Sequence, residues 1–241
     1  MAFIGEDRLL VDEDLDMEGI TRKLVLFDMS GMGESIGTVG EVRFVCDPRY
    51  HSTRVGVMAE GAGYSDFSQV IGQGVPFYPD PSRRVLALIF SCPESIHYKV
   101  LGVCVVHSET ILRLAGEAGE GVIEWDAWRK YTIAPDTDDV PGVVGSPKYS
   151  VSGSRFVRVY TNEAEKWAKV KSYDLSHWSR QQPDLGPDGC GGVDKMRFRL
   201  IEGFIALPQS VWKVCDAVVL QDSLVLFSVS SPPLFLRFDN G

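Results

Sequence analysis

Apolar residues recur along this chain in short runs rich in Val, Leu, Ile and Phe, and each run is bounded by Gly, Pro, Asp or Ser. Short length and a high content of β-branched and aromatic residues are typical of strands. The runs lie at residues 24–27, 42–46, 54–58, 85–90, 100–106, 155–160, 170–173, 197–201, 217–220, 224–229 and 234–238. The pattern predicts an all-β fold built mainly of antiparallel strands.

Only two stretches favour a helix. Ser108 is placed to cap a short helix over residues 108–115, which we expect to end at the glycine that follows. Residues 126–130 form a further turn, or Trp125 and Trp128 belong to an irregular loop. In either case we expect the two indole rings to pack this segment onto a sheet.

A loose internal repeat consists of an apolar strand, a polar turn and a second strand that ends in an acidic or polar residue. It occurs as residues 8–11 before 23–28, 154–160 before 169–174, and 223–227 before 234–239. Repeated antiparallel pairs are typical of β-propeller blades and β-sandwiches. The spacing is irregular, so we expect a degenerate or partial propeller-like fold. We expect a single β-rich domain over residues 1–241, either whole or a piece of a larger propeller.

Charge and cysteine content narrow the function classes. The net charge of −9 disfavours a phosphate-binding surface, and we expect no nucleic-acid partner. No apolar segment approaches the length of a membrane span, and no signal peptide is apparent, so we expect no membrane association. The five cysteines form no C-x-x-C pair, which indicates reduced thiols in the cytoplasm, the nucleus or both: Cys46, Cys92, Cys104, Cys190 and Cys215. Cys104 lies in an apolar run and is predicted to be a core residue.

The segments that resemble motifs for catalysis, cofactor binding or metal binding each lack a required feature. The glycines of residues 31–37 precede a strand-like segment, whereas a phosphate-binding turn opens a helix. The four histidines lack the spacing of helical metal ligands, and Ser154 lacks the second glycine of a nucleophile elbow. Asp136, Asp138 and Asp139 lack the later glutamate and central glycine of a calcium loop. We therefore assign no catalytic, cofactor or metal site.

Aromatic residues remain as candidates for partner binding. Most tryptophans fill cores, so a surface role needs a polar setting. Trp178 lies between His177 and Ser179 in a polar loop and is the first candidate for an exposed anchor. Trp128 and Tyr78 are the other two.

Three segments resemble the C-terminal region of fungal (basidiomycete-type) F-box proteins. They read Phe-Tyr-Pro-Asp-Pro-Ser-Arg-Arg at residues 77–84, a strand running into a short helix at 103–115, and Trp-Asp-Ala-Trp at 125–128. Residues 170–176 and 222–227 resemble later family segments in the same order. The resemblance implies an intracellular, non-catalytic module that recognises a protein substrate for a ubiquitin ligase. No F-box is visible in the chain, so the resemblance implies a Skp-type adaptor as partner only where an upstream F-box exists.

A second hypothesis comes from a different class of protein. A small hydrolase or a sugar-binding protein on a propeller scaffold would line a central pocket with carboxylates such as Asp28, Asp174 and Asp239. A recognition module should instead present a broad exposed aromatic patch without such a cluster.

Overall fold

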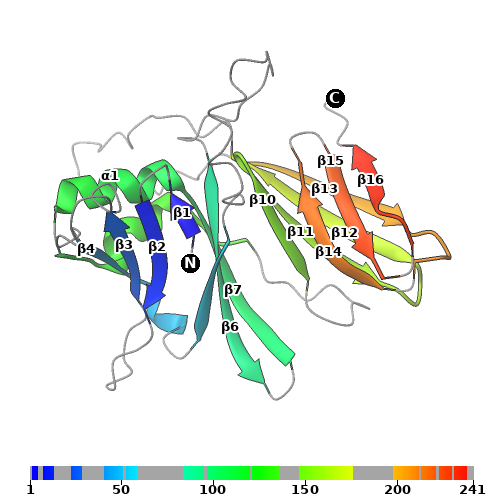
Figure 1. Cartoon of the computed structure of the whole chain (residues 1–241), viewed down its shortest axis with the longest axis horizontal. Helices are drawn as coiled ribbons and strands as arrows, with labels where there is room; N and C mark the ends of the chain where they lie inside the picture. Colours follow the sequence, from blue (N-terminus) through cyan, green and yellow to red (C-terminus); the bar gives the residue numbers. More distant parts are fainter. Residues whose placement is uncertain are drawn as a thin grey trace, which may run out of the picture.

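The structure is a computed structural model, and the part of the chain that it describes forms four β-sheets and two short helices (Figure 1). The described ranges are 2–4, 8–13, 23–28, 41–50, 53–58, 84–94, 97–119, 121–135, 147–175, 198–211, 213–220, 223–229 and 231–237. We name the sheets A to D in the order in which their first strands occur along the chain. The prediction of an all-β, mainly antiparallel fold is confirmed.

Sheets A and B come from the first half of the chain. Sheet A has the order β1-β2-β3-β4-β8, with β1 (Ala2–Ile4), β2 (Arg8–Glu13), β3 (Lys23–Asp28), β4 (Glu41–Val45) and β8 (Gly121–Ile123). Sheet B has the order β5-β6-β7-β9, with β5 (Arg54–Met58), β6 (Val85–Glu94), β7 (His97–His107) and β9 (Thr132–Ile133). Every pairing is antiparallel except that of β8 with β4.

Sheets C and D come from the second half. Sheet C has the order β10-β11-β12-β13, with β10 (Lys148–Ser152), β11 (Arg155–Asn162), β12 (Trp167–Asp174) and β13 (Arg199–Ala206). Sheet D has the order β14-β15-β16, with β14 (Val214–Val219), β15 (Ser223–Ser228) and β16 (Leu234–Arg237). Within each sheet the strands follow the chain as an antiparallel meander. The degenerate or partial propeller-like arrangement stays a prediction.

Each sheet packs against the next one along the chain. One apolar cluster joins sheets A and B and includes Leu24, Phe44, Leu88 and Cys104. A second joins B and C through residues such as Ala87 and Phe156, and a third joins C and D. Cys104 is buried as predicted, and burial raises the pKa of its thiol to about 12, so the thiol stays protonated.

One hydrogen bond with a backbone donor accompanies each of these junctions. Asp12 Oδ2 accepts from the Val55 amide at 3.4 Å between sheets A and B. Between B and C, the Val85 amide donates to the carbonyl of Gly153 at 2.8 Å. Between C and D, the Val219 amide donates to Ser150 Oγ at 2.9 Å. These bonds fix neighbouring sheets at defined positions along their strands.

The helices differ in detail from the prediction. Helix α1 (Ser108–Ala118) runs through Gly116 and ends before Gly119, which has φ 68°. Ser108 is the first helical residue and does not cap the helix, since its hydroxyl donates to the carbonyl of Arg84 at 3.1 Å. Helix α2 (Trp125–Trp128) continues as a 3-10 turn over Arg129–Tyr131, which confirms the further turn. Neither of these described helices has the length and apolarity of a membrane span.

The internal repeat corresponds to real hairpins. Its three occurrences are the antiparallel pairs β2–β3, β11–β12 and β15–β16. In the first two, an arginine that opens one strand forms an ion pair with the aspartate that ends the next: Arg8 with Asp28, and Arg155 with Asp174 at 3.6 Å. Three strands went unpredicted, namely β8, β9 and β10, because two are very short and the third is rich in polar residues.

Tyr50 lies in the connection between sheets A and B and packs this connection against sheet B. Its ring stacks on Phe90 with centroids 4.4 Å apart. The ring covers Gly102, which pairs with Phe90 in the ladder, and a Cβ on this glycine would overlap the end of the Tyr50 ring. Glycine is required here because an aromatic ring occupies the place of a side chain.

We predict that Gly102→Ala lowers the free energy of unfolding by about 1–3 kcal/mol, because the Tyr50 ring must leave its site on Phe90. Chemical denaturation measures the change. Gly203→Ala is the matched control, since a Cβ at that strand position meets nothing within 4 Å. In a Tyr50→Ala background the cost of Gly102→Ala should shrink, and an undiminished cost would contradict the explanation.

Candidate interaction surface

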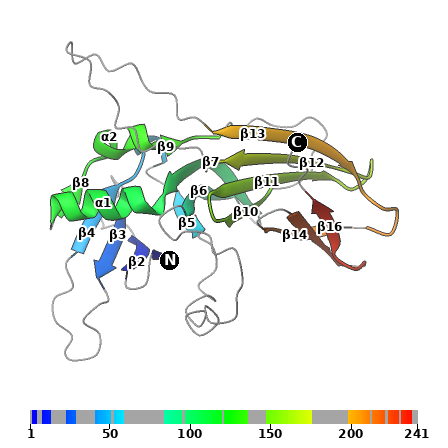
Figure 2. The same ribbon diagram turned by 90° about the horizontal axis from the view of Figure 1, so that it is seen from above.

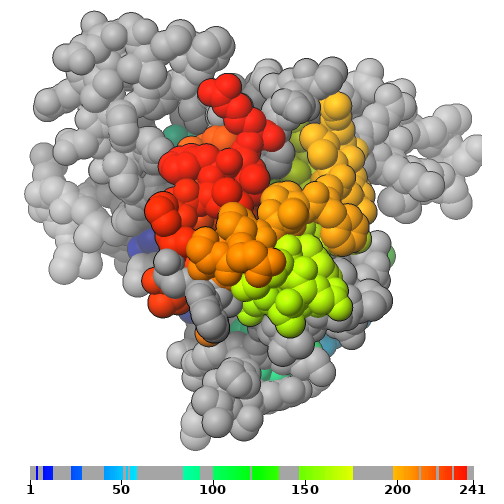
Figure 3. Space-filling view, turned by 90° about the vertical axis from the view of Figure 1, so that its right-hand side faces the viewer, coloured from blue at the N-terminus to red at the C-terminus, as the bar shows by residue number. Residues whose placement is uncertain are grey.

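Exposed large apolar side chains concentrate in the last quarter of the described chain. All but Leu101 and Val122 come from residue 198 onward: Phe198, Leu200, Phe204, Val218, Leu220, Phe227, Val229 and Phe235. Figure 3 shows residues of sheets C and D together on one face of the molecule. Clustered apolar residues at a surface mark sites of interaction.

The first group lies along β13, the outermost strand of sheet C in Figure 2. Leu200, Glu202 and Phe204 alternate along this strand and share one side of the sheet. On the same side, their neighbours on β12 are Tyr173, Lys171 and Lys169. We call this group the edge surface: Trp167, Lys169, Lys171, Phe198, Leu200, Glu202 and Phe204.

Aromatic contacts order the edge surface at both ends. The rings of Trp167 and Phe204 meet edge to face at 5.7 Å, and those of Tyr173 and Phe198 lie 5.5 Å apart. Phe204 nevertheless stays 70% exposed. Its ring is therefore held in place while most of its surface faces solvent.

Cations line the middle of the same side of sheet C. Arg158 and Lys171 are cross-strand neighbours and are only 4% and 7% exposed. The Arg158 guanidinium lies over the rings of Tyr160 and Tyr149, at 4.6 and 5.6 Å. Burial raises the pKa of the Tyr149 hydroxyl, although the charge of Arg158 lowers it in part. Tyr149 is therefore a neutral ring beneath a cation.

The two lysines of the edge surface share a carboxylate. Lys171 Nζ lies 3.3 Å from Glu202 Oε1, and Lys169 Nζ lies 3.6 Å from Glu202 Oε2. Lys169 Nζ also lies 5.5 Å from the centroid of the Phe204 ring. Both ammonium groups thus reach from β12 toward the outer strand.

The second group lies on sheet D. Val218, Phe227 and Phe235 alternate with residues that pack toward sheet C, so they occupy the opposite side of the sheet. Phe235 is 69% exposed. We call this group the sheet D surface.

The aromatic residues that the sequence predicted as partner-binding anchors are not among the residues that define these two surfaces. Trp128 is fully buried, its Nε1 donates to the Val45 carbonyl at 2.9 Å, and its ring meets Phe44 edge to face. Trp125 packs edge to face on Trp128 at 4.7 Å. The structure therefore supports the packing role predicted for both tryptophans and leaves no exposed Trp128 ring for a partner. Trp178 and Tyr78 lie outside the described residues.

The carboxylates of the enzyme hypothesis are engaged locally. Asp28 and Asp174 each pair with an arginine of their own hairpin, and Asp239 lies outside the described residues. In the described part of the chain, no three His, Cys, Asp or Glu side chains are grouped to hold a metal ion. The glycine cluster at 31–37 and the aspartates of 136–139 also lie outside the described ranges.

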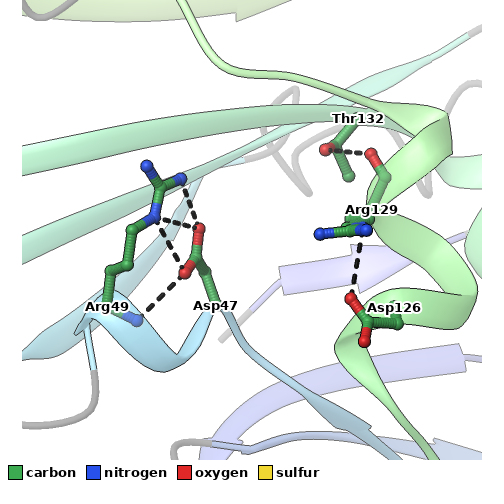
Figure 4. A network of polar contacts seen from close by, with 5 residues as sticks. All are labelled: Asp47, Arg49, Asp126, Arg129 and Thr132. Atoms are coloured by element: carbon green, nitrogen blue, oxygen red, sulfur yellow. Dashed lines mark hydrogen bonds and ion pairs between the residues drawn. The ribbon is translucent and has the colours of Figure 1, made fainter. Parts of the chain in front are cut away.

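Asp47 is a buried carboxylate, and Figure 4 shows its surroundings. Burial alone raises the pKa of this group, but the hydrogen bonds and charge of Arg49, with a smaller contribution from Arg129, lower the pKa below its ordinary value. Arg49 donates from Nη2 at 2.6 Å and from its backbone amide at 3.0 Å. The Tyr50 amide donates to the Asp47 carbonyl at 3.0 Å. The group therefore shapes the turn that carries Tyr50.

We predict that Trp128→Ala lowers the free energy of unfolding by about 3–5 kcal/mol, because it empties a core site and leaves the Val45 carbonyl without its donor. Urea denaturation measures the effect. Trp167→Ala is the control, because this half-exposed indole donates to Glu165 and should cost much less. Equal losses for both variants would contradict the assignment of Trp128 to the core.

We predict that Asp47→Asn lowers the free energy of unfolding at pH 7 by about 1–3 kcal/mol. Because the folded-state pKa is lowered, the contribution of Asp47 is fully present above the unfolded-state pKa of about 4 and is lost as the pH falls through the folded-state pKa. The difference between wild type and variant should therefore be constant from about pH 5 to 8 and shrink in acid. Asp126→Asn removes an exposed ion pair with Arg129 and should leave the midpoint unchanged.

No protein-family model, curated protein or solved structure matches the chain.

Proposed function

We propose that this chain is a non-catalytic protein-interaction module and that it binds a protein partner through the edge surface and the sheet D surface. The observation that carries the proposal is the gathering of exposed Phe, Leu and Val side chains on sheets C and D. Exposed apolar area is costly in water, and aromatic side chains are enriched at protein interfaces. A partner that covers these residues recovers that free energy.

The contacts that hold the Phe204 side chain also support this proposal. Phe204 is held by Trp167 from one side and approached by Lys169, so its rotamer is restricted before a partner arrives. A restricted aromatic side chain loses little conformational entropy on binding. Such residues are the usual energetic centres of interfaces.

The family resemblance gives the proposal a biological setting. We propose that the partner is a substrate that a ubiquitin ligase of the F-box type recognises, as in the fungal proteins that the chain resembles. A Skp-type adaptor belongs to this proposal only together with an upstream F-box. The amount of the partner in cells tests this part separately from binding. The partner should become less abundant when the chain is present, and a proteasome inhibitor should reverse the loss.

The central test is capture of partners from cells by the whole chain and by matched surface variants. We predict that Phe204→Lys and Phe235→Lys, at positions 70% and 69% exposed, keep the fold and reduce capture. A buried charge at the centre of an interface costs about 2 kcal/mol or more, which is roughly thirtyfold in affinity.

Val122→Lys is the matched control, because Val122 is exposed on β8 of sheet A, away from both surfaces. Its capture should equal that of the wild type. If both phenylalanine variants also capture the same partners at wild-type levels, the proposed function is wrong.

A further inference from the structure

Among the described strands, none pairs with the outer edge of β13. The strand covers Arg199–Ala206 and ends the order of sheet C. Leu200 and Phe204 are exposed on one side of it, and the half-buried Ile201 and Ile205 lie on the other. A long apolar edge strand is a template for an added strand.

The edge surface also carries more positive than negative charge. Lys169 and Lys171 contribute two ammonium groups, and Glu202 is the carboxylate paired with both. Burying a charge is costly unless an opposite charge accompanies it. A further carboxylate at this place would therefore be stabilised.

The excess positive charge lies on the side of sheet C that is bounded by β13. Both ammonium groups lie toward β13, because they contact Glu202, and Lys169 Nζ lies near the Phe204 ring. A side chain on a strand added to β13 would project beside Leu200, Glu202 or Phe204. The carboxylate would thus reach the lysines from the β13 edge of sheet C, where no further described strand pairs.

We propose that an extended acidic segment of the partner protein adds to sheet C along β13, with a carboxylate beside Lys169 and Lys171 and apolar side chains against Leu200 and Phe204. The proposal rests on the proposed function and names the chemistry of the partner. Main-chain hydrogen bonds supply general affinity, and the lysines select the sign of the charge. The chain carries a net charge of −9, but repulsion from distant acids is screened beyond about 8 Å at physiological salt.

The test uses the full chain and a set of fluorescein-labelled seven-residue peptides of alternating threonine and valine. In each peptide one valine is replaced by glutamate, and the replacement is made at each of the three valine positions so that every register is sampled. Matched peptides carry glutamine, lysine or phosphoserine at the same position. Fluorescence anisotropy gives the dissociation constants, and hydrogen exchange reports protection of the backbone amides.

We predict that the best glutamate peptide binds about tenfold more tightly than its glutamine and lysine counterparts and protects residues 199–206 from exchange. Lys169→Met and Lys171→Met should each reduce the preference for glutamate, because methionine keeps the apolar stem and removes the charge. Phe204→Lys should abolish binding. Val122→Lys on β8 of sheet A should leave peptide binding unchanged, and thermal unfolding checks that all variants are folded.

The opposite outcomes are equally distinct. Equal binding of glutamate and lysine peptides, a preference that survives both methionine substitutions, tighter binding of phosphoserine than of glutamate, or binding of no peptide would each overturn the acidic strand. If capture of cellular partners still depends on Phe204, the interaction surface stands and only the acidic strand fails. If capture is independent of Phe204 and Phe235, the proposed function itself fails.

Discussion

The fold depends on the apolar character of both faces of its two middle sheets. In β6, Leu86 and Leu88 pack toward sheet A, whereas Val85 and Ala87, which alternate with them, pack toward sheet C. Sheet C repeats this arrangement, with Phe156 facing sheet B and Val157 facing sheet D. A strand that is apolar on both faces is stable only between two layers, so each of the two middle sheets must have a neighbour on either side. The serial packing from A to D follows from this requirement.

The connections between sheets carry the polar groups that fix the layers. Asp47 and Arg49 shape the turn that brings Tyr50 onto Phe90, and Trp128 anchors α2 to the Val45 carbonyl. Asp47 and Trp128 are buried and hydrogen-bonded, as groups with a structural role should be. The polar cluster of sheet C differs, because two lysines share one carboxylate at an open strand edge.

The exposed surfaces follow from the same serial packing. The inner strands of sheet C bury Phe156 and Tyr173 against sheet B, but β13 lies farther out and leaves Leu200 and Phe204 exposed. Sheet D has sheet C on one side, and Phe235 is exposed on the other. Apolar residues at such positions are buried where another sheet covers them. They are exposed on the end strand β13 of sheet C and on the face of sheet D that lies away from sheet C. This is the physical origin of the proposed binding surface.

The sequence by itself determined most of the strands and three of the hairpins. Runs such as residues 85–90 and 100–106 are continuous and apolar, and the repeat of an apolar strand, a polar turn and a second strand that ends in an acidic or polar residue marks β2–β3, β11–β12 and β15–β16. The candidate interaction surface was not predicted: Trp128 is core, and in the region of β13 the sequence predicted only a strand over residues 197–201. Alternation shows which residues share a face, but it does not show which strand ends a sheet or which face lacks a neighbour. Only the packing of the sheets decided that Phe204, on the end strand of sheet C, is exposed while Phe156, on an inner strand, is buried.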